Sequence, residues 1–167
     1  MKESGFQFSA REGSTELSLS KTVDQKRIEI LFEAKLLAID QNRTEEAEKK
    51  YLEANKIKTV ITVTDDSKPK ALVIEGFFIG TQLDIRTVVF TDDLQAHLAL
   101  PADERNNNTF AAEFGEVNLE IQAAAYDYLE SFGLRSEFLS LLWSKGGDRE
   151  FKLYKNWLKD FKQFTTI

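Results

Sequence analysis

Cysteine is absent from this sequence of 167 residues, and histidine and methionine each occur once. Without cysteine the chain can form no disulfide, no thiolate nucleophile and no cysteine-ligated zinc site. A single histidine, His97, also excludes a metal site built on two histidines. No run of about 18 apolar residues occurs, so the sequence predicts no membrane-spanning helix. Disulfide scaffolds, thiol enzymes and helical membrane proteins are therefore excluded.

Residues suited to catalysis are equally scarce. His97 has Asp93 four residues earlier, but a general base needs further oriented partners. Gly146 and Gly147 lack the wider glycine and lysine pattern of a phosphate-binding loop. We therefore expect a soluble binding protein, not an enzyme, with no cofactor and no metal. The alternative is an enzyme or a small-ligand binder, which would need a deep apolar pocket lined by convergent polar groups.

The bulk composition is that of one folded domain spanning residues 1–167. Hydrophobic residues make up 42% of the chain and charged residues 30%, which is typical of globular proteins. Apolar and polar residues alternate with a period near two over the first two thirds of the chain. This period predicts seven strands between about residues 5 and 115, at 6–9, 16–20, 28–33, 57–63, 71–79, 83–90 and 109–114.

The connections between these strands are mostly short and contain turn residues. Glu12-Gly13-Ser14, Val23-Asp24-Gln25, Asp65–Pro69 and Gly80-Thr81 each fit a tight turn. Consecutive strands should therefore pair as an antiparallel meander. The segment 44–56 is either a short helix capped by Thr44 or a solvated insertion between two strands, and its thin apolar content favours the insertion.

After Asn118 the apolar period changes to 3.6, which predicts helices over about residues 118–164. The first should end at Gly133, and Ser136 should cap the second. We expect Gly146-Gly147 to interrupt this helix and Asp148 to cap a final one from residue 149. The sequence thus predicts the α+β class, with the helices following the sheet.

The final helix carries a broad apolar stripe. Either the stripe packs on the domain's own sheet, or part of it faces another subunit, and the spacing leaves both open. Four lysines lie beside it and either solvate the helix, pair with acids of a neighbouring subunit, or contact phosphates. The stripe consists of Phe151, Tyr154, Trp157, Leu158, Phe161 and Phe164, and the lysines are Lys152, Lys155, Lys159 and Lys162.

Charge is unevenly distributed along the chain, whose formal net charge is −6. Residues 92–120 contain seven acids and one base, whereas residues 145–162 contain six bases and three acids. An acidic protein repels phosphate backbones and attracts basic partners. We predict an acidic partner-binding face made of Asp65, Asp66, Asp92, Asp93, Asp103, Glu104, Glu113 and Glu116. The simpler alternative is a solvated surface.

Three segments carry a resemblance to a known family. The C-terminal segment, with YDYLESFGL, FLSLLW and REFKLYKNWLKDFKQF, closely resembles the mitochondrial acidic matrix protein family. That family is also called the mitochondrial glycoprotein family and includes the protein that binds the globular heads of complement. TELSLSKTVDQKRIEILFEA resembles its first hairpin, and ALVIEGFFIGTQLDIRTVVF its central hairpin. The similarity covers most of the chain.

This resemblance implies a twisted seven-stranded antiparallel sheet flanked by helices and assembled as a ring-shaped homotrimer. Family members use the last helix in trimer contacts, usually with a further helix that precedes the first strand; this sequence opens at the strand. The resemblance also implies a mitochondrial matrix protein that binds several partners, acts like a chaperone or adaptor, and supports RNA processing, translation or respiration. Met1–Gly5 do not form a targeting sequence. Basic proteins, including RNA-binding proteins, are the expected partners, and direct RNA contact is the alternative.

Overall fold

The computed structural model describes residues 5–33, 55–102, 104–105 and 110–165. Its centre is one antiparallel sheet in which each strand pairs with the next strand of the sequence. The predicted seven-stranded meander is confirmed, while most of the segment 44–56 lies outside the described residues. The strands are β1 (Gln7–Ala10), β2 (Glu16–Val23), β3 (Lys26–Glu33), β4 (Ile57–Asp65), β5 (Ala71–Ile79), β6 (Gln82–Thr91) and β7 (Ala111–Glu113).

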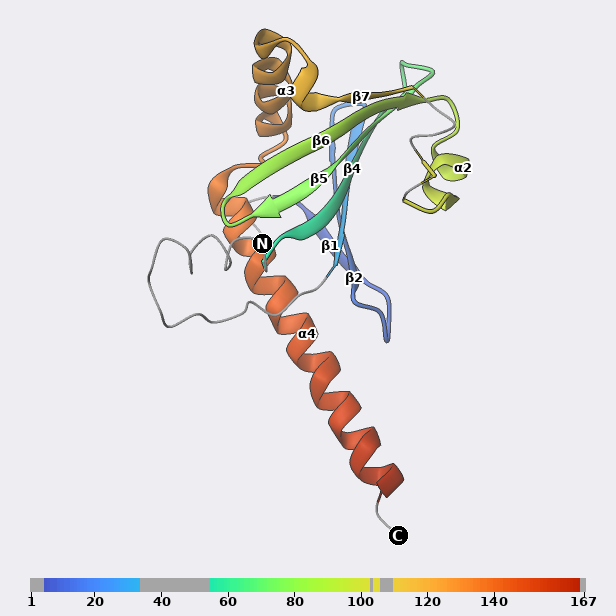
Figure 1. The fold of residues 1–167 in the computed structure, drawn as a ribbon, viewed down its shortest axis with the longest axis vertical. Helices are drawn as coiled ribbons and strands as arrows, with labels where there is room; N and C mark the ends of the chain where they lie inside the picture. Colours follow the sequence, from blue (N-terminus) through green and yellow to red (C-terminus); the bar gives the residue numbers. More distant parts are fainter. Residues whose placement is uncertain (1–4, 34–54, 103, 106–109, 166–167) are drawn as a thin grey trace.

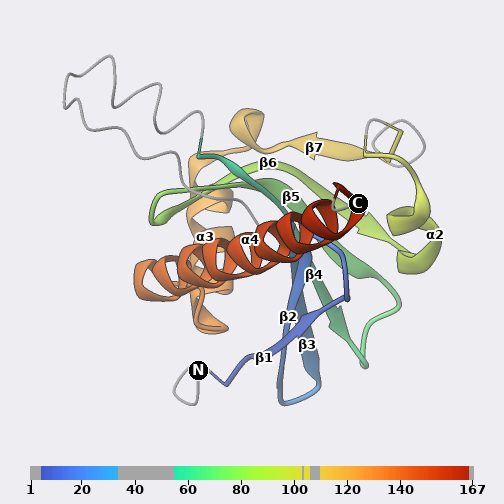
Figure 2. The same cartoon turned by 90° about the horizontal axis from the view of Figure 1, so that it is seen from below.

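Two of the hairpins close through two-residue turns, as the sequence indicates. Val23 pairs with Lys26, and Asp24 between them has a φ of 55°. Ile79 pairs with Gln82, and Gly80 has a φ of 57°. Positive φ in such short turns matches the right-handed twist of the strands that they join. Figure 2 shows this twist, since β2 and β3 run nearly across the direction of β6 and β7.

The helices are α2 (Leu94–Ala99), α3 (Leu119–Ser131) and α4 (Ser136–Thr165), and a short 3₁₀ turn η1 (Phe114–Glu116) precedes α3. The Asn118 side chain caps α3 by accepting the N–H of Glu120 at 2.8 Å, and Gly133 follows α3 with a φ of 99°. Both boundaries agree with the sequence. The helix α2 was not expected, because six residues are too few for a helical period to be recognised.

The predicted helix break at Gly146-Gly147 is wrong, and Asp148 caps no helix. Instead α4 continues through both glycines as one helix of 30 residues. A glycine costs a helix only about 1 kcal/mol, and packing compensates here. Gly146 is buried beside Leu142 and Trp143. Just beyond the pair, the Arg149 guanidinium donates hydrogen bonds to the carbonyl oxygens of Arg11 and Ser14.

The main core lies where α3 and the first half of α4 cover one face of the sheet (Figure 1). The rings of Phe6 and Phe138 lie 4.5 Å apart between centroids. The Trp143 indole donates to the carbonyl of Gly80, and Lys21 Nζ donates to the carbonyl of Phe132 at 2.9 Å. A smaller apolar cluster on the other face joins α2 to β4, β5 and β6. Both faces of the central strands are therefore covered.

Candidate binding surfaces

The last part of α4, residues 151–165, is a helical extension that we call the arm. In Figure 1 it leaves the domain at one end, whereas α3 and β7 lie at the other end. Its apolar stripe is 40–90% exposed, so it does not pack on the domain's own sheet. Trp157 stacks between Tyr154 and Phe161, with ring centroids 6.2 and 5.3 Å away. The arm is thus an unburied aromatic ladder.

The arm also carries a positive excess. Its four lysines are exposed and stand against one acid, Asp160. Lys155 Nζ lies 4.5 Å from the centroid of the Phe151 ring, within cation–π range. Because the lysines flank the aromatic stripe, the arm has the composition of a basic amphipathic helix.

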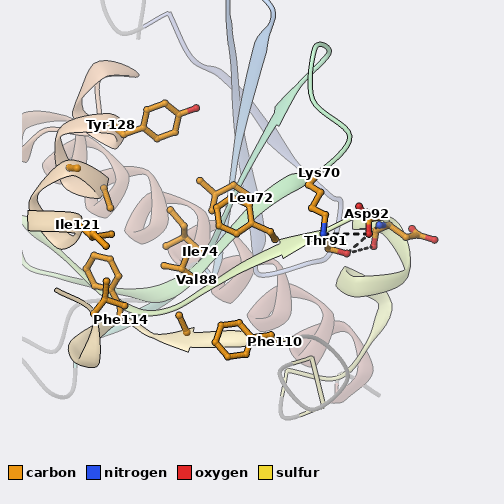
Figure 3. A pocket seen from close by; sticks show the side chains of 16 residues that line it. Lys70, Leu72, Ile74, Val88, Thr91, Asp92, Phe110, Phe114, Ile121 and Tyr128 are labelled. Carbon is orange, nitrogen blue, oxygen red and sulfur yellow. Dashed lines mark hydrogen bonds and ion pairs between the residues drawn. The ribbon is translucent and has the colours of Figure 1, made fainter.

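A second apolar surface is a groove of about 950 Å³ between the sheet and α3 (Figure 3). Its floor comes from β5 and β6, one wall from β7 and η1, and the other wall from α3. Phe110 and Phe90 at its border are 88% and 59% exposed. The lining apolar side chains include Leu72, Ile74, Val88, Phe114, Val117, Ile121 and Ala124.

Polar side chains of the groove gather at two places. Lys70, Thr91, Asp92 and Asp93 lie at one end, where Lys70 Nζ is 3.8 Å from the Asp92 carboxylate. Tyr128 lies on the α3 wall, and burial raises the pKa of its phenol above the usual 10.0, while Lys68 lowers this pKa and Asp65 raises it by smaller amounts. Among the described residues no group of three potential metal ligands exists. The groove is therefore an apolar surface with a polar end.

Four of the predicted partner-binding acids meet at this end of the sheet. Asp65 is the last residue of β4 and Asp66 follows it, while Asp92 and Asp93 follow β6. Ala71, which opens β5, pairs with Thr91 beside them. Asp65 contacts Lys68 at 4.0 Å, and hydrogen bonds from Ser67 hold the pKa of its carboxyl below the usual 3.8. The nearby lysines are Lys26, Lys68 and Lys70, so this cluster is largely charge-balanced.

The remaining predicted acids do not join one face. Glu104 lies in the turn after α2, and Arg105 anchors that turn by binding Glu75 at 2.8 Å and the carbonyl of Leu98. Glu113 alternates with Ala112, which lines the groove, so Glu113 points to the opposite side of the strand. Asp103 lies outside the described residues. The seven described acids of the prediction therefore do not form one continuous face.

A more uniform acidic surface runs along η1 and α3. No lysine or arginine occurs between residues 110 and 134, and the acids of α3 form no ion pair within the described part of the chain. Glu120, Ala124 and Asp127 form one helical row, and Ala124 lines the groove. We call Glu116, Glu120, Asp127 and Glu130, all exposed, the α3 acids.

Sequence reasoning named Glu116 and counted Glu120, but it missed Asp127 and Glu130. These two residues could have been predicted, because the acidic segment continues past Glu120 and no lysine or arginine interrupts it before residue 135.

His97 is a buried residue of α2. Its ring is 4% exposed beneath α2, and neither ring nitrogen has a hydrogen-bond partner among the described residues. The Asp93 carboxylate accepts the N–H of Ala96 at 2.9 Å and thereby caps α2. The two side chains therefore form no catalytic pair.

Comparison with known proteins now places the chain. The family model MAM33, described as mitochondrial glycoprotein, matches residues 1–165. The chain belongs to the mitochondrial glycoprotein family. Within this family, the mitochondrial acidic protein mam33 of Schizosaccharomyces pombe is 29% identical over 129 residues, which cover 74% of this chain and 48% of that protein. The chain thus spans about half of that relative's length.

Two solved structures share the fold of this family member. A Leishmania major protein of unknown function, described as a sequence homologue of human p32 protein, has a TM-score of 0.70 and 17% identity. The p22 protein of Trypanosoma brucei has a TM-score of 0.67 and 17% identity. Each match covers 97% of this chain, and 83% and 82% of the other chains.

The described residues contain no candidate for a membrane-spanning helix, because none of their helices combines the required length with the required hydropathy.

Proposed function

We propose that this family member is a non-catalytic acidic adaptor of the mitochondrial matrix that recruits basic proteins and supports RNA processing, translation or respiration. Its membership of a mitochondrial acidic protein family supports the compartment. The observation that carries the binding role is the row of exposed α3 acids, because no basic residue of the described chain neutralises them. Such a surface attracts cationic partners and raises their association rate.

Salt dependence tests this role directly. A lysine-rich probe, poly-L-lysine, is titrated into the protein at low and at physiological ionic strength. Affinity should fall as salt rises, since exposed charges are screened beyond about 8 Å at 0.15 M. The triple substitution Glu120→Gln, Asp127→Gln and Glu130→Gln should weaken binding about tenfold at low salt, at roughly 0.5 kcal/mol per exposed charge.

A matched control removes three exposed acids that lie away from α3, through Glu12→Gln, Asp24→Asn and Glu137→Gln. Both triple variants change the net charge equally, so only the location differs. Equal weakening by the two variants would mean that net charge alone attracts the probe. Binding that does not respond to salt would contradict the adaptor proposal altogether.

The second part of the proposal is assembly as a ring-shaped homotrimer through the arm. An exposed stripe of six large apolar side chains is unusual for a monomer and marks an interaction surface. Light scattering should give about three times the chain mass of 19.1 kDa. A mass of one chain at micromolar concentration would refute this part and leave the electrostatic part standing.

Direct RNA binding is the second candidate, favoured by the exposed lysine row of the arm. Changing Lys152, Lys155, Lys159 and Lys162 to Glu should abolish RNA retention in a gel-shift experiment if the lysines contact phosphates. The mass of the assembly should stay unchanged. If the assembly dissociates instead, the lysines serve subunit contacts and this candidate fails.

A further inference from the structure

Outside the arm, the exposed large apolar side chains gather around the groove. Four such side chains occur among the described residues that precede the arm, and three of them, Phe90, Phe110 and Ile121, line the groove. The fourth, Leu119, is the first residue of α3. Exposed apolar side chains that gather in one place mark an interaction surface.

The border of the groove favours a macromolecular partner over a small ligand. The volume of about 950 Å³ lies at the upper end of the roughly 300–1,000 Å³ found for small-ligand sites, which bury most of their ligand. However, the rings of Phe110 and Phe90 at the border are 88% and 59% exposed. A small ligand on the floor would leave both rings in water, whereas a longer partner that crosses the border covers them.

The α3 wall places carboxylates beside the apolar lining. Its lining residues recur every three or four positions, as one face of a helix does. They are Ile121, Ala124, Ala125 and Tyr128. The exposed acids Glu120 and Asp127 flank Ala124 in the neighbouring helical row. These two acids are seven residues apart, which is about 10.5 Å along the helix axis at 1.5 Å per residue. The α3 border therefore presents two carboxylates that are two helical turns apart.

The end of the groove at β6 adds two more carboxylates. Asp92 and Asp93 are exposed there, and Lys70 is the one cation among the lining residues. Lys70 Nζ lies 3.8 Å from the Asp92 carboxylate, but both side chains are more than half exposed, so the pair is weak. With Glu120 and Asp127, four carboxylates border the groove against one lysine, an excess of three negative charges. This border attracts a cationic partner.

We propose that the groove binds a basic amphipathic helix of another protein. Its apolar side chains lie on the floor formed by β5 and β6, and its lysines or arginines lie toward Glu120, Asp127 and Asp92. Basic side chains two turns apart on such a helix have the same spacing as Glu120 and Asp127. Anchors three, four and seven residues apart are a common way for a helix to fill an apolar groove. The inference rests on the adaptor function proposed above and names the kind of segment that the adaptor recruits.

Two synthetic peptides of identical composition test the helical partner. Both consist of about 18 residues of leucine, alanine and lysine, long enough to form a helix. In the first peptide the leucines recur every three or four positions, and in the second leucine and lysine alternate. The first should bind at least about tenfold more tightly, as measured by the anisotropy of a fluorescent label, because only it presents one apolar face as a helix. Equal affinity of the two peptides would overturn the inference.

Two apolar positions on α3 provide a matched pair of variants. Ile121→Ala removes three carbon atoms from the groove, and Leu119→Ala removes three from an exposed side chain that does not line it. Ile121→Ala should weaken binding of the helical peptide about five- to tenfold, and Leu119→Ala less than about twofold. Both side chains are more than half exposed, so circular dichroism should show that both variants fold. Equal effects of the two substitutions would contradict binding in the groove.

Lys70 tests the charge of the partner. Lys70→Gln should tighten binding of the helical peptide about threefold, because it frees Asp92 from an ion pair and removes a cation that repels the peptide. The control Lys58→Gln changes the net charge equally at an exposed residue of β4 and should have a smaller effect. If Lys70→Gln weakened binding instead, the groove would prefer an anionic group and the inference would fail.

Further outcomes separate the groove from the adaptor function. Wild-type protein that binds neither poly-L-lysine nor the helical peptide would refute both. Wild-type protein that binds poly-L-lysine in a salt-dependent manner, but does not prefer the helical peptide, keeps the adaptor function and overturns only the groove. Light scattering of Ile121→Ala should give the wild-type mass. A lower mass would show that the groove is a contact between copies of the chain, which also overturns the inference.

Discussion

At the residue scale, the ion pair between Arg105 and Glu75 is the most consequential polar contact. Both side chains are largely buried, and Arg105 also binds the carbonyls of Leu98 and Leu100. Arg105→Met should lower the free energy of unfolding by about 3 kcal/mol, because it leaves the Glu75 carboxylate without its partner in an apolar site. Urea unfolding followed by circular dichroism measures this loss.

The matched control is the ion pair between Arg86 and Asp84, whose side chains remain partly exposed at a similar distance of 2.7 Å. Arg86→Met should cost less than about 1 kcal/mol. Adding Glu75→Gln to Arg105→Met should recover part of the loss, since the uncompensated charge is then gone. Equal costs for the two arginine substitutions would show that burial does not govern the Arg105 pair.

A second prediction concerns the carboxyl of Asp65. Ser67 donates to it through its hydroxyl and its backbone N–H, which lowers the pKa of Asp65, and Lys68 contributes less. Ser67→Ala should therefore raise the pKa of Asp65 more than Lys68→Ala does, as measured by carboxyl ¹³C NMR titration.

The sign of the effect on stability follows from this lowered pKa. Asp65 favours the folded state above pH 3.8, and this contribution is lost as the pH falls through the lower pKa of the folded state. If Lys68→Ala raised the pKa of Asp65 more than Ser67→Ala does, the charge of Lys68 and not the hydrogen bonds of Ser67 would be the main cause of the lowered pKa.

At the scale of elements, Gly76 and Gly147 should respond in opposite directions to substitution by alanine. The register of β5 against β6 shifts at Gly76, where a Cβ atom would lie 2.2 Å from the Asp84 carbonyl oxygen. Gly76→Ala should destabilise the protein by about 3 kcal/mol or more through backbone overlap. Gly147 lies in α4, where an added Cβ atom would meet nothing within 4 Å, so Gly147→Ala should stabilise the protein by about 0.5–1 kcal/mol. Thermal unfolding of both variants compares them, and destabilisation by Gly147→Ala would show that α4 needs its glycine.

Secondary structure was predictable where local chemistry decides it. The alternation of apolar and polar residues predicted the strands, and turn residues such as Asp24 and Gly80 predicted the hairpins. Both features depend mainly on residues that are close in sequence. The break at Gly146-Gly147 was wrong because packing against residues far along the chain outweighs a weak local preference.

At the scale of the whole molecule, the two tryptophans report different events. Trp143 is buried against Gly80, whereas Trp157 is 56% exposed on the arm. In a Trp143→Phe variant the fluorescence of Trp157 should shift to shorter wavelength as protein concentration rises and the arm becomes covered. Tyr154→Lys in the same background should abolish this shift. An emission maximum that is independent of concentration between nanomolar and micromolar protein would argue against an arm that becomes buried.

The sequence predicted some of the residues of the candidate surfaces, but not their exposure and not the groove. The aromatic stripe and the lysine row followed from helical spacing, but their exposure depends on where α4 leaves the domain. The groove escaped prediction because Ile74 and Val88 alternate like any core residues. The described acids of the predicted face lie on different strand faces and beside lysines that are distant in sequence, and the sequence alone does not reveal either fact.

The strand order has a consequence for how the chain is made. Every strand finds its partner in the strand just synthesised, so pairing can keep pace with a ribosome. The residues that shield one face of the sheet, in α3 and α4, are translated after all seven strands. A nascent chain therefore presents an uncovered apolar sheet face until the residues from Leu119 onward emerge, and deletion of α3 and α4 should make folding depend on chaperones.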